Sequence, residues 1–203
     1  MDRPAGPSAD ATLPDYLDHE LDLVVIGQNP SPASIAARCY YGNPRNRFWP
    51  AFRAAGLAPP EFEPDPAGFE WLRDHQRIGF TDVVKTPTPG AGDLRAADFR
   101  AWAPVLDGHL RTYRPRIAWF NGKGVYQSYL RYGLGLKPPT IALGEQPETL
   151  DDTIVCVTPN PSPANAAFSL EALTAWYRQV AARRDRLRAP IPTPPDSQRT
   201  NPD

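Results

Sequence analysis

The sequence predicts an α/β fold in which helices cover both faces of a parallel sheet. Short apolar runs alternate along the chain with longer segments whose apolar residues recur at helical spacing. The 203 residues are enough for one domain with a sizeable core and too few for two. We expect a single domain at 14–187, between mobile, Pro-rich tails at 1–13 and 188–203.

The expected strands and helices alternate in chain order. The apolar runs predict buried strands at 21–27, 79–84, 116–120 and 153–159. The periodic segments predict helices at 46–57, 94–113, 122–132 and 169–187. Pro104 lies inside the second of these helices and predicts a kink or a later start. Strands that alternate with helices in this way favour a parallel sheet.

Composition narrows the class of protein. No apolar run approaches the roughly 18 residues of a membrane span, and we expect no membrane contact. Only Cys39 and Cys156 are present, which predicts a reducing cytoplasm, with nucleoid association if the chain is bacterial. None of the three histidines stands at metal-ligand spacing, so we expect neither a metal nor another cofactor.

Charge is distributed unevenly along the chain. The net charge is −1, but residues 1–22 hold six acidic residues and one basic residue. The remainder is therefore mildly basic, with 21 basic and 17 acidic residues. Such an excess is compatible with phosphate binding.

The tetrapeptide NPSP occurs twice, at 29–32 and at 160–163, each time after an apolar run. A duplicated domain, a favoured local turn or two halves of one site would each explain the repetition. The two halves of the chain are otherwise dissimilar, which makes duplication the weaker explanation. Ligands of open parallel sheets bind at the carboxyl ends of the strands. We therefore expect the two turns to face each other across one crevice.

The first turn, GQNPSP, contains residues suited to chemistry. Gly27 lacks a Cβ, which lets a ligand approach the backbone. Asn29 offers a hydrogen-bond donor and an acceptor with which to orient a water or bind a heterocycle. The alternative interpretation of Asn29 is a structural one, in which it only initiates an Asn-Pro turn.

The segment CYYGNPRNRFWP supplies aromatic side chains. Tyr41 precedes Gly42 in a loop, and an aromatic ring there is suited to stacking on a planar base. Core packing is the alternative for Tyr41 and the expected role of Phe48 and Trp49.

Two further loops carry charged residues. Asp93, after the flexible stretch PGAG, is a candidate to activate water or to stabilise a cationic transition state. As an alternative, Asp93 caps a helix that begins near Leu94. Lys123 opens a helix in NGKGVYQ, where a phosphate would meet both the helix N-terminus and the lysine. No GxGxxG or GxxxxGK[ST] motif is present.

Taken together, these segments resemble the mismatch-specific uracil/thymine-DNA glycosylases of the uracil-DNA glycosylase superfamily, over residues 21–182. GQNPS resembles the first active-site motif, and YYGNPRNRFW resembles the base-stacking segment. IGFTDVVKTPTPGAGDL and RPRIAWFNGKGVY are similar to the thymine-glycosylase branch. PNPSPANA occupies the place of the second motif, which precedes a wedge that enters the DNA.

The resemblance implies a three-layer α/β/α sandwich with a four-stranded parallel sheet. It also implies a monomeric, monofunctional hydrolase that extrudes a mispaired uracil or thymine from double-stranded DNA and cuts the N-glycosidic bond, which leaves an abasic site. Single-stranded DNA is a further candidate partner. The implied catalytic residue is Asn29, which orients the water. Asp93 is a departure from the family pattern, and we expect it as a second catalytic residue that shares or takes over water activation. The implied base pocket comprises Gln28, Ser34, Tyr41 and Asn160, with Ser34 limiting room for a 5-substituent. The implied DNA contacts are Ser31, Lys123, Ser162, Pro163, Ala164 and Asn165.

The second motif departs from the expected family pattern. The wedge at 163–166 is Pro-Ala-Asn-Ala, without the Leu and Arg expected in the bacterial mismatch branch. A short wedge fills the gap left by the flipped base poorly and contacts the opposite guanine weakly. Broader uracil substrates are therefore also compatible with the sequence. The alternatives are a glycosylase for hypoxanthine and other deaminated purines, which YYGNPRNRFW also resembles, and an inactive binder of damaged DNA.

Overall fold

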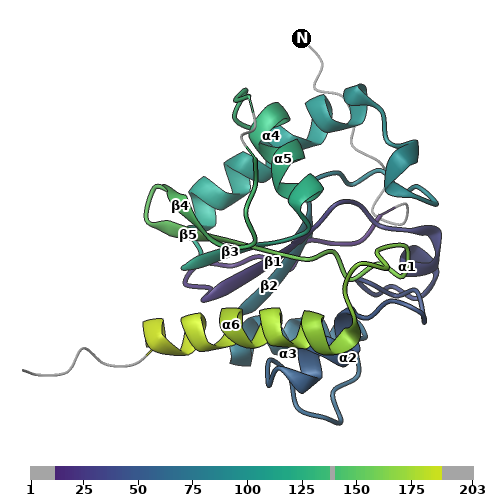
Figure 1. Ribbon diagram of the computed structural model, residues 1–203, viewed down its shortest axis with the longest axis vertical. Helices are drawn as coiled ribbons and strands as arrows, with labels where there is room; N and C mark the ends of the chain where they lie inside the picture. The colour runs from purple at the N-terminus through teal and green to yellow at the C-terminus, as the bar shows by residue number, and fades with distance from the viewer. Residues whose placement is uncertain (1–11, 138–139, 189–203) are drawn as a thin grey trace, which may run out of the picture.

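A five-stranded sheet forms the middle layer of the structure, a computed structural model that describes residues 12–137 and 140–188 (Figure 1). Its strands are β1 (Leu23–Gly27), β2 (Ile78–Asp82), β3 (Ile117–Asn121), β4 (Gly144–Leu150) and β5 (Thr153–Thr158). The spatial order is β2-β1-β3-β5-β4. The first four strands of this order are parallel, and β4 pairs antiparallel with β5 at one edge.

Helices cover both faces of the sheet. They are α1 (Pro32–Ala36), α2 (Phe48–Ala54), α3 (Pro66–Gln76), α4 (Ala96–Tyr113), α5 (Lys123–Tyr132) and α6 (Leu170–Arg188). In Figure 1, α4 and α5 lie on one face, and α2, α3 and α6 lie on the other. The α/β/α sandwich predicted from the sequence is confirmed.

The strands form because their side chains are buried on both faces. In β1, Leu23 and Val25 point into one apolar cluster, and Val24 and Ile26 point into the other. All four side chains are fully buried. Side chains alternate across a strand, so a strand between two helical layers must be apolar at every position.

Three elements were not expected from the sequence, namely α1, α3 and β4. The segment of β4, GEQPETL, contains Gly, Pro and two Glu, and its pairing register with β5 shifts between Glu145 and Thr149. An edge strand tolerates such residues because one of its sides makes no hydrogen bonds to a neighbouring strand. The four-stranded sheet is thus extended by a fifth, antiparallel strand. The expected late start at Pro104 is wrong, because α4 begins at Ala96 and includes Pro104.

The domain boundaries also differ slightly from the expected ones. Leu13 was assigned to the N-terminal tail, but it is buried in the core with 2% of its surface exposed. Arg188 was assigned to the C-terminal tail, but it is the last residue of α6 and donates a hydrogen bond to Asp22. The rest of the expected tails, 1–11 and 189–203, lies outside the described residues. No described helix is long and apolar enough to cross a membrane.

The strand order fixes where a ligand would bind. From β1 the chain passes to β2 on one side and then to β3 on the other, so the direction of the connections reverses between β1 and β3. Loops that leave the carboxyl ends of two such strands diverge and open a crevice. Gly27 and Asn121, the last residues of β1 and β3, stand at this point.

Candidate active site

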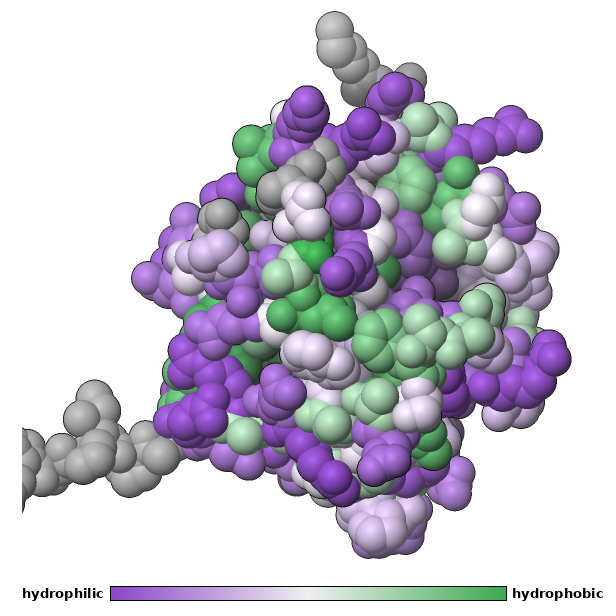
Figure 2. All heavy atoms as spheres, viewed as in Figure 1, coloured by the Kyte–Doolittle hydropathy of each residue, from purple (hydrophilic) through white to green (hydrophobic). Residues whose placement is uncertain are grey.

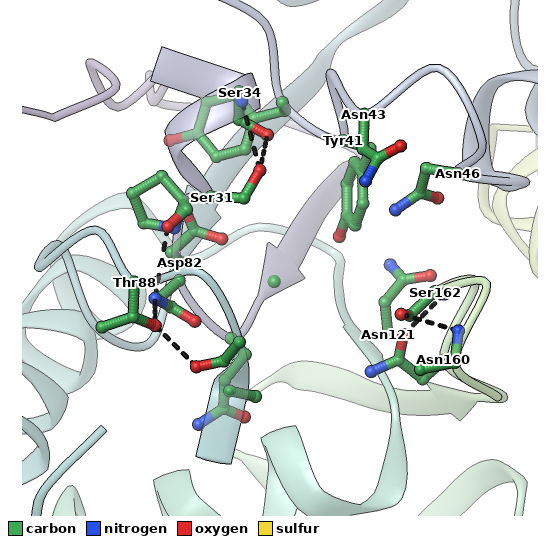
Figure 3. A pocket seen from close by; sticks show the side chains of 18 of the residues that line it. Ser31, Ser34, Tyr41, Asn43, Asn46, Asp82, Thr88, Asn121, Asn160 and Ser162 are labelled. Atoms are coloured by element: carbon green, nitrogen blue, oxygen red, sulfur yellow. Dashed lines mark hydrogen bonds between the residues drawn. The ribbon is translucent and has the colours of Figure 1, made fainter. Parts of the chain in front are cut away.

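A cavity of about 500 Å³ opens at the carboxyl edge of the sheet. The first NPSP turn contributes Asn29 and Ser31 to its lining, and the second contributes Asn160 and Ser162. Figure 3 shows these parts of the chain around the same space. The two turns therefore share one crevice, as the sequence predicts. Gln28, Ser34, Tyr41, Pro163 and Ala164 also line the cavity.

Asn29 is held firmly by the loop that follows β2. Its Nδ2 atom donates to Thr88 Oγ1 at 2.7 Å, to Thr86 O at 3.0 Å and to Pro30 O at 3.2 Å. These contacts occupy Nδ2, the donor atom of the amide. The Oδ1 atom of Asn29 therefore remains available to accept a hydrogen bond from a ligand. An amide fixed in this way can accept a hydrogen bond from a water and orient it.

The floor of the cavity is formed by Gly27 and Asp82, which pair across β1 and β2. A Cβ atom on Gly27 would stand 2.2 Å from Asp82 Oδ1 and 3.3 Å from Tyr41 Oη. The glycine is therefore required for a different reason from the one expected. The space beside its Cα is filled by the Asp82 carboxyl group, and not by an approaching ligand.

Asp82 is a buried carboxyl group with 5% of its surface exposed. Its Oδ2 atom has no hydrogen-bond partner among the described residues. Burial raises the pKa of Asp82 to about 7, although the nearby Lys85 ammonium opposes this and the Asp15 carboxylate adds to it. Asp82 was not predicted as a site residue from the sequence, because it is a single polar residue at the end of an apolar run.

Tyr41 adopts a left-handed backbone conformation with φ of 57°. Its ring stacks on Phe48 at a centroid distance of 3.9 Å and an interplanar angle of 12°. Ser34 Oγ accepts a hydrogen bond from the Gly42 amide at 3.1 Å and so fixes the following turn. Burial and the charge of Asp82 raise the pKa of Tyr41. Phe48 covers one face of the ring, which leaves the other face to meet a planar ligand.

Asparagine side chains gather around this cavity. Among the described residues, five line it: Asn29, Asn43, Asn46, Asn121 and Asn160. The sixth, Asn165, donates to Asn160 O at 2.9 Å. Asn121 accepts from Tyr177 Oη at 2.8 Å, and its buried Nδ2 has no partner in the described part of the chain. Amides present donors and acceptors without charge, which suits the edge of a nucleobase.

Three of the predicted site residues, Asp93, Lys123 and Asn165, lie outside the lining. The Asp93 carboxylate accepts a hydrogen bond from the Gly90 amide at 2.9 Å and caps the 3-10 turn η2 (Ala91–Asp93). This geometry favours the capping interpretation, although the cap belongs to η2 and not to the following helix. Lys123 is exposed at the first turn of α5, outside the cavity. Between 12 and 188, omitting 138–139, no group of three or more metal-binding side chains comes together.

Comparison with known proteins agrees with this architecture. The model of the uracil DNA glycosylase superfamily matches residues 14–183. The chain belongs to this superfamily. A G/U mismatch-specific uracil DNA glycosylase from Schizosaccharomyces pombe is 28% identical over 165 residues, which are 78% of this chain and 49% of the relative. The chain thus spans about half the length of the curated relative it matches.

A solved structure supports the fold assignment. The solution NMR structure of a candidate uracil DNA glycosylase from Methanosarcina acetivorans aligns with a TM-score of 0.51 and 26% identity. The alignment covers 85% of this chain and 98% of that one. The layered sheet and the helices around it are therefore shared with that protein.

In this superfamily member the second NPSP turn is held by Arg47. Its guanidinium donates to the carbonyl oxygens of Phe168, Ser162 at 2.7 Å and Asn165 at 2.8 Å. Within the turn, Asn160 Oδ1 accepts from the Ser162 amide at 2.8 Å. Figure 2 shows small, weakly hydrophobic residues over this loop between β5 and α6. The sequence does not predict this role of Arg47. Its partners are backbone carbonyl groups, which every residue has, so they leave no pattern in the sequence.

We expect Arg47→Met to weaken DNA binding about tenfold, because the loop that carries Ser162, Pro163 and Ala164 loses its main support. The dependence of affinity on salt should not change, since Arg47 is committed to carbonyl oxygens and not to phosphates. Lys123→Ala is the matched comparison and should lower the salt slope by about one. Fluorescence anisotropy at several salt concentrations measures both, and a reduced slope for Arg47→Met would contradict the structural role.

Proposed function

We propose that this chain is a monofunctional DNA glycosylase. It hydrolyses the N-glycosidic bond of uracil in DNA, including mispaired uracil in double-stranded DNA, and more slowly of thymine, and it leaves an abasic site. The observation that carries the proposal is the fixed amide of Asn29, whose Nδ2 donates to three loop oxygens beside a cavity that four further asparagine side chains also line. The family match and the name of the relative from Schizosaccharomyces pombe support it.

The cavity suits an extruded base better than a base within a duplex. A volume of about 500 Å³ accommodates one nucleobase and its sugar. A stacked base cannot reach it, so the nucleotide must rotate out of the helix, which costs least at a mismatch. The free face of Tyr41 would stack on the base, and the surrounding amides would meet its edge.

The reaction moves charge in a defined direction. As the bond between C1′ and N1 breaks, the sugar becomes positive and the pyrimidine becomes negative. Asn29 Oδ1 would hold a water against C1′, and the oxygen of this water forms the new bond. One proton of the water ends on the released base. Ser34, buried beside Tyr41, would limit the room for a methyl group at C5 and so favour uracil over thymine.

The second turn would grip the DNA. Pro163 and Ala164 are exposed at the mouth of the cavity, where they would face the gap left by the extruded nucleotide. Neither side chain carries a hydrogen-bonding group for the opposite base. We therefore propose weak discrimination by the opposite base, so that uracil opposite guanine, uracil opposite adenine and single-stranded uracil all react.

Single-turnover release of the base tests this proposal. Duplexes with G·U, A·U, G·T and hypoxanthine, and a single strand with uracil, are compared under excess protein. We expect the three uracil substrates to react within about tenfold of one another and G·T to react more slowly. Release of hypoxanthine in preference to uracil would assign the chain to deaminated purines. Binding without any release would make it a damage-binding protein.

A further inference from the structure

Three buried polar atoms at the cavity lack a hydrogen-bond partner of standard geometry among the described residues, namely Asp82 Oδ2, Tyr41 Oη and Asn121 Nδ2, and a weaker side-chain contact with Asn121 lowers the pKa of Tyr41. Figure 3 shows the three side chains around the same space. Most buried polar groups are satisfied, and a cluster that is not satisfied marks where a ligand supplies the missing partners. Asp82 differs from the other two because its hydrogen-bonding character depends on its protonation.

We propose that Asp82 is a catalytic residue that meets the extruded base in its protonated form and donates a hydrogen bond to it as the base leaves. This role rests on the proposed glycosylase function and adds a second group to Asn29. Asn29 would serve the sugar side of the bond, where water attacks, and Asp82 would serve the base side, where negative charge collects.

The surroundings of Asp82 favour its neutral form. In the described part of the chain no group donates a hydrogen bond to Asp82 Oδ2, whereas buried carboxylates normally accept several. The cation that lowers the pKa of Asp82, Lys85 Nζ, donates to Asp15 Oδ1 at 2.7 Å and to Tyr40 Oη at 3.1 Å. A carboxylate at Asp82 would therefore be buried without direct compensation.

The position of Asp82 places it against the base and not against the sugar. It ends β2 at the floor of the cavity, where its Oδ1 atom occupies the space beside the Cα of Gly27. Asn29 comes from the loop beyond β1, two residues after the end of the strand at Gly27. A planar base that enters edge-first reaches the floor, while its sugar and phosphates remain at the mouth.

The chemistry of the step requires a neutral donor. The electron pair of the C1′–N1 bond passes to the base, and a hydrogen bond from the Asp82 hydroxyl would stabilise the resulting anion. A carboxylate at the same place would repel this charge. Asp82 keeps its proton through the cycle, because the proton that the base finally takes comes from the attacking water. A buried acid that stays neutral near pH 7 in order to donate a hydrogen bond has precedent in other enzymes.

This role predicts an unusual pH dependence. Burial raises the pKa of Asp82 to about 7, so the donor is present below this pH and is lost above it. The titratable groups that face it are Lys85, Asp15, Tyr40 and Tyr41, and His109 lies 3.8 Å from Asp15. The negative charge of Asp15 raises the pKa of Asp82. The variant Asp15→Asn should therefore move the loss of activity to lower pH.

The test compares wild type, Asp82→Asn and Asp82→Ala in single-turnover base release from a G·U duplex between pH 5.5 and 9. For wild type we expect a constant rate at low pH and a fall approaching tenfold per pH unit above about pH 7. Asp82→Asn keeps the shape and a donor but cannot ionise. It should stay within about tenfold of wild type at pH 6 and lose the alkaline fall.

A second substrate separates catalysis from structure. With 5-fluorouracil, whose anion is more stable, Asp82→Ala should lose much less activity than the roughly hundredfold loss expected with uracil. Equal losses on both bases, a wild-type rate that rises through pH 7, or inactivity of Asp82→Asn at every pH would overturn the proposal. Absence of release by wild type from every duplex would instead contradict the glycosylase function, and this role with it.

Discussion

Asn29→Ala should lower the single-turnover rate of uracil release on the order of 10² to 10³-fold, because the oriented water loses the amide oxygen that holds it. The affinity for a G·U duplex should remain within about threefold of wild type, since Asn29 Nδ2 already donates to Thr86, Thr88 and Pro30 and is not available to a phosphate. Rapid-quench measurement of release, with anisotropy in parallel, provides both numbers.

Thr88→Val is a graded companion to this variant. It removes the 2.7 Å hydrogen bond from Asn29 Nδ2 to Thr88 Oγ1 but leaves the two carbonyl partners. We expect a loss of about tenfold, intermediate between wild type and Asn29→Ala. Equal rates for Thr88→Val and Asn29→Ala would contradict this account. They would mean that the hydrogen bond between Asn29 and Thr88 acts by holding the loop in place, and that the amide oxygen of Asn29 is not the decisive group.

Asp22→Asn should lower the free energy of unfolding by about 3 kcal/mol, the largest loss of stability that we expect from one substitution of this size. Asp22 is 1% exposed just before β1, at the end of the sheet opposite the cavity. Its carboxylate lies 2.6 Å from Arg188 Nε, 3.4 Å from Arg116 Nε and 3.5 Å from Arg77 Nε. An amide cannot compensate three guanidinium groups, and it would place an N–H group among them.

Urea denaturation measures this effect, and Asp74→Asn is its control. Asp74 pairs with Arg73 at 2.6 Å on the surface, where 47% of its side chain is exposed. Exposed pairs of this kind contribute little to stability, because water and salt screen them. The rate of base release at low temperature should be unchanged in both variants, because neither residue lies near the cavity. A loss for Asp22→Asn no greater than that for Asp74→Asn would contradict the account of the buried cluster.

The layered fold was predictable because its strands are apolar on both faces. Val24, Val25, Trp119 and Val157 lie in runs with no polar interruption, which is the pattern of strands covered by helices on two sides. Helix α3 was not predicted, although Asp65 followed by Pro66 is a recognisable start, with the Asp65 side chain accepting from the Gly68 amide at 2.7 Å. Its apolar stripe is too sparse to signal a helix by periodicity.

The site was predictable only where residues stand in loops with a motif. Asn29, Tyr41 and Asn160 were found in this way, and all three line the cavity. Asp82 and Asn121 were missed because each is the last residue of an apolar strand, and the sequence does not show that β1, β2 and β3 end at one point. Their chemistry arises from strand order, which brings together residues far apart in the chain.

Asp93 and Asp82 illustrate the same limit. Both are carboxylates between the second strand and the fourth helix, and the flexible PGAG stretch made Asp93 the more conspicuous candidate. In the structure, the Asp93 carboxylate turns to the Gly90 amide, whereas Asp82 is buried at the cavity with a raised pKa. Burial decides which carboxyl group has a raised pKa, and burial depends on the tertiary fold.

The most direct test of the central claim is base release from a G·U duplex by the full chain, with both products identified by mass spectrometry. Our account predicts free uracil together with an intact abasic strand, and neither product with Asn29→Ala over the same time. Strand cleavage without free uracil, or tight binding with no release, would contradict hydrolysis of the glycosidic bond at this cavity.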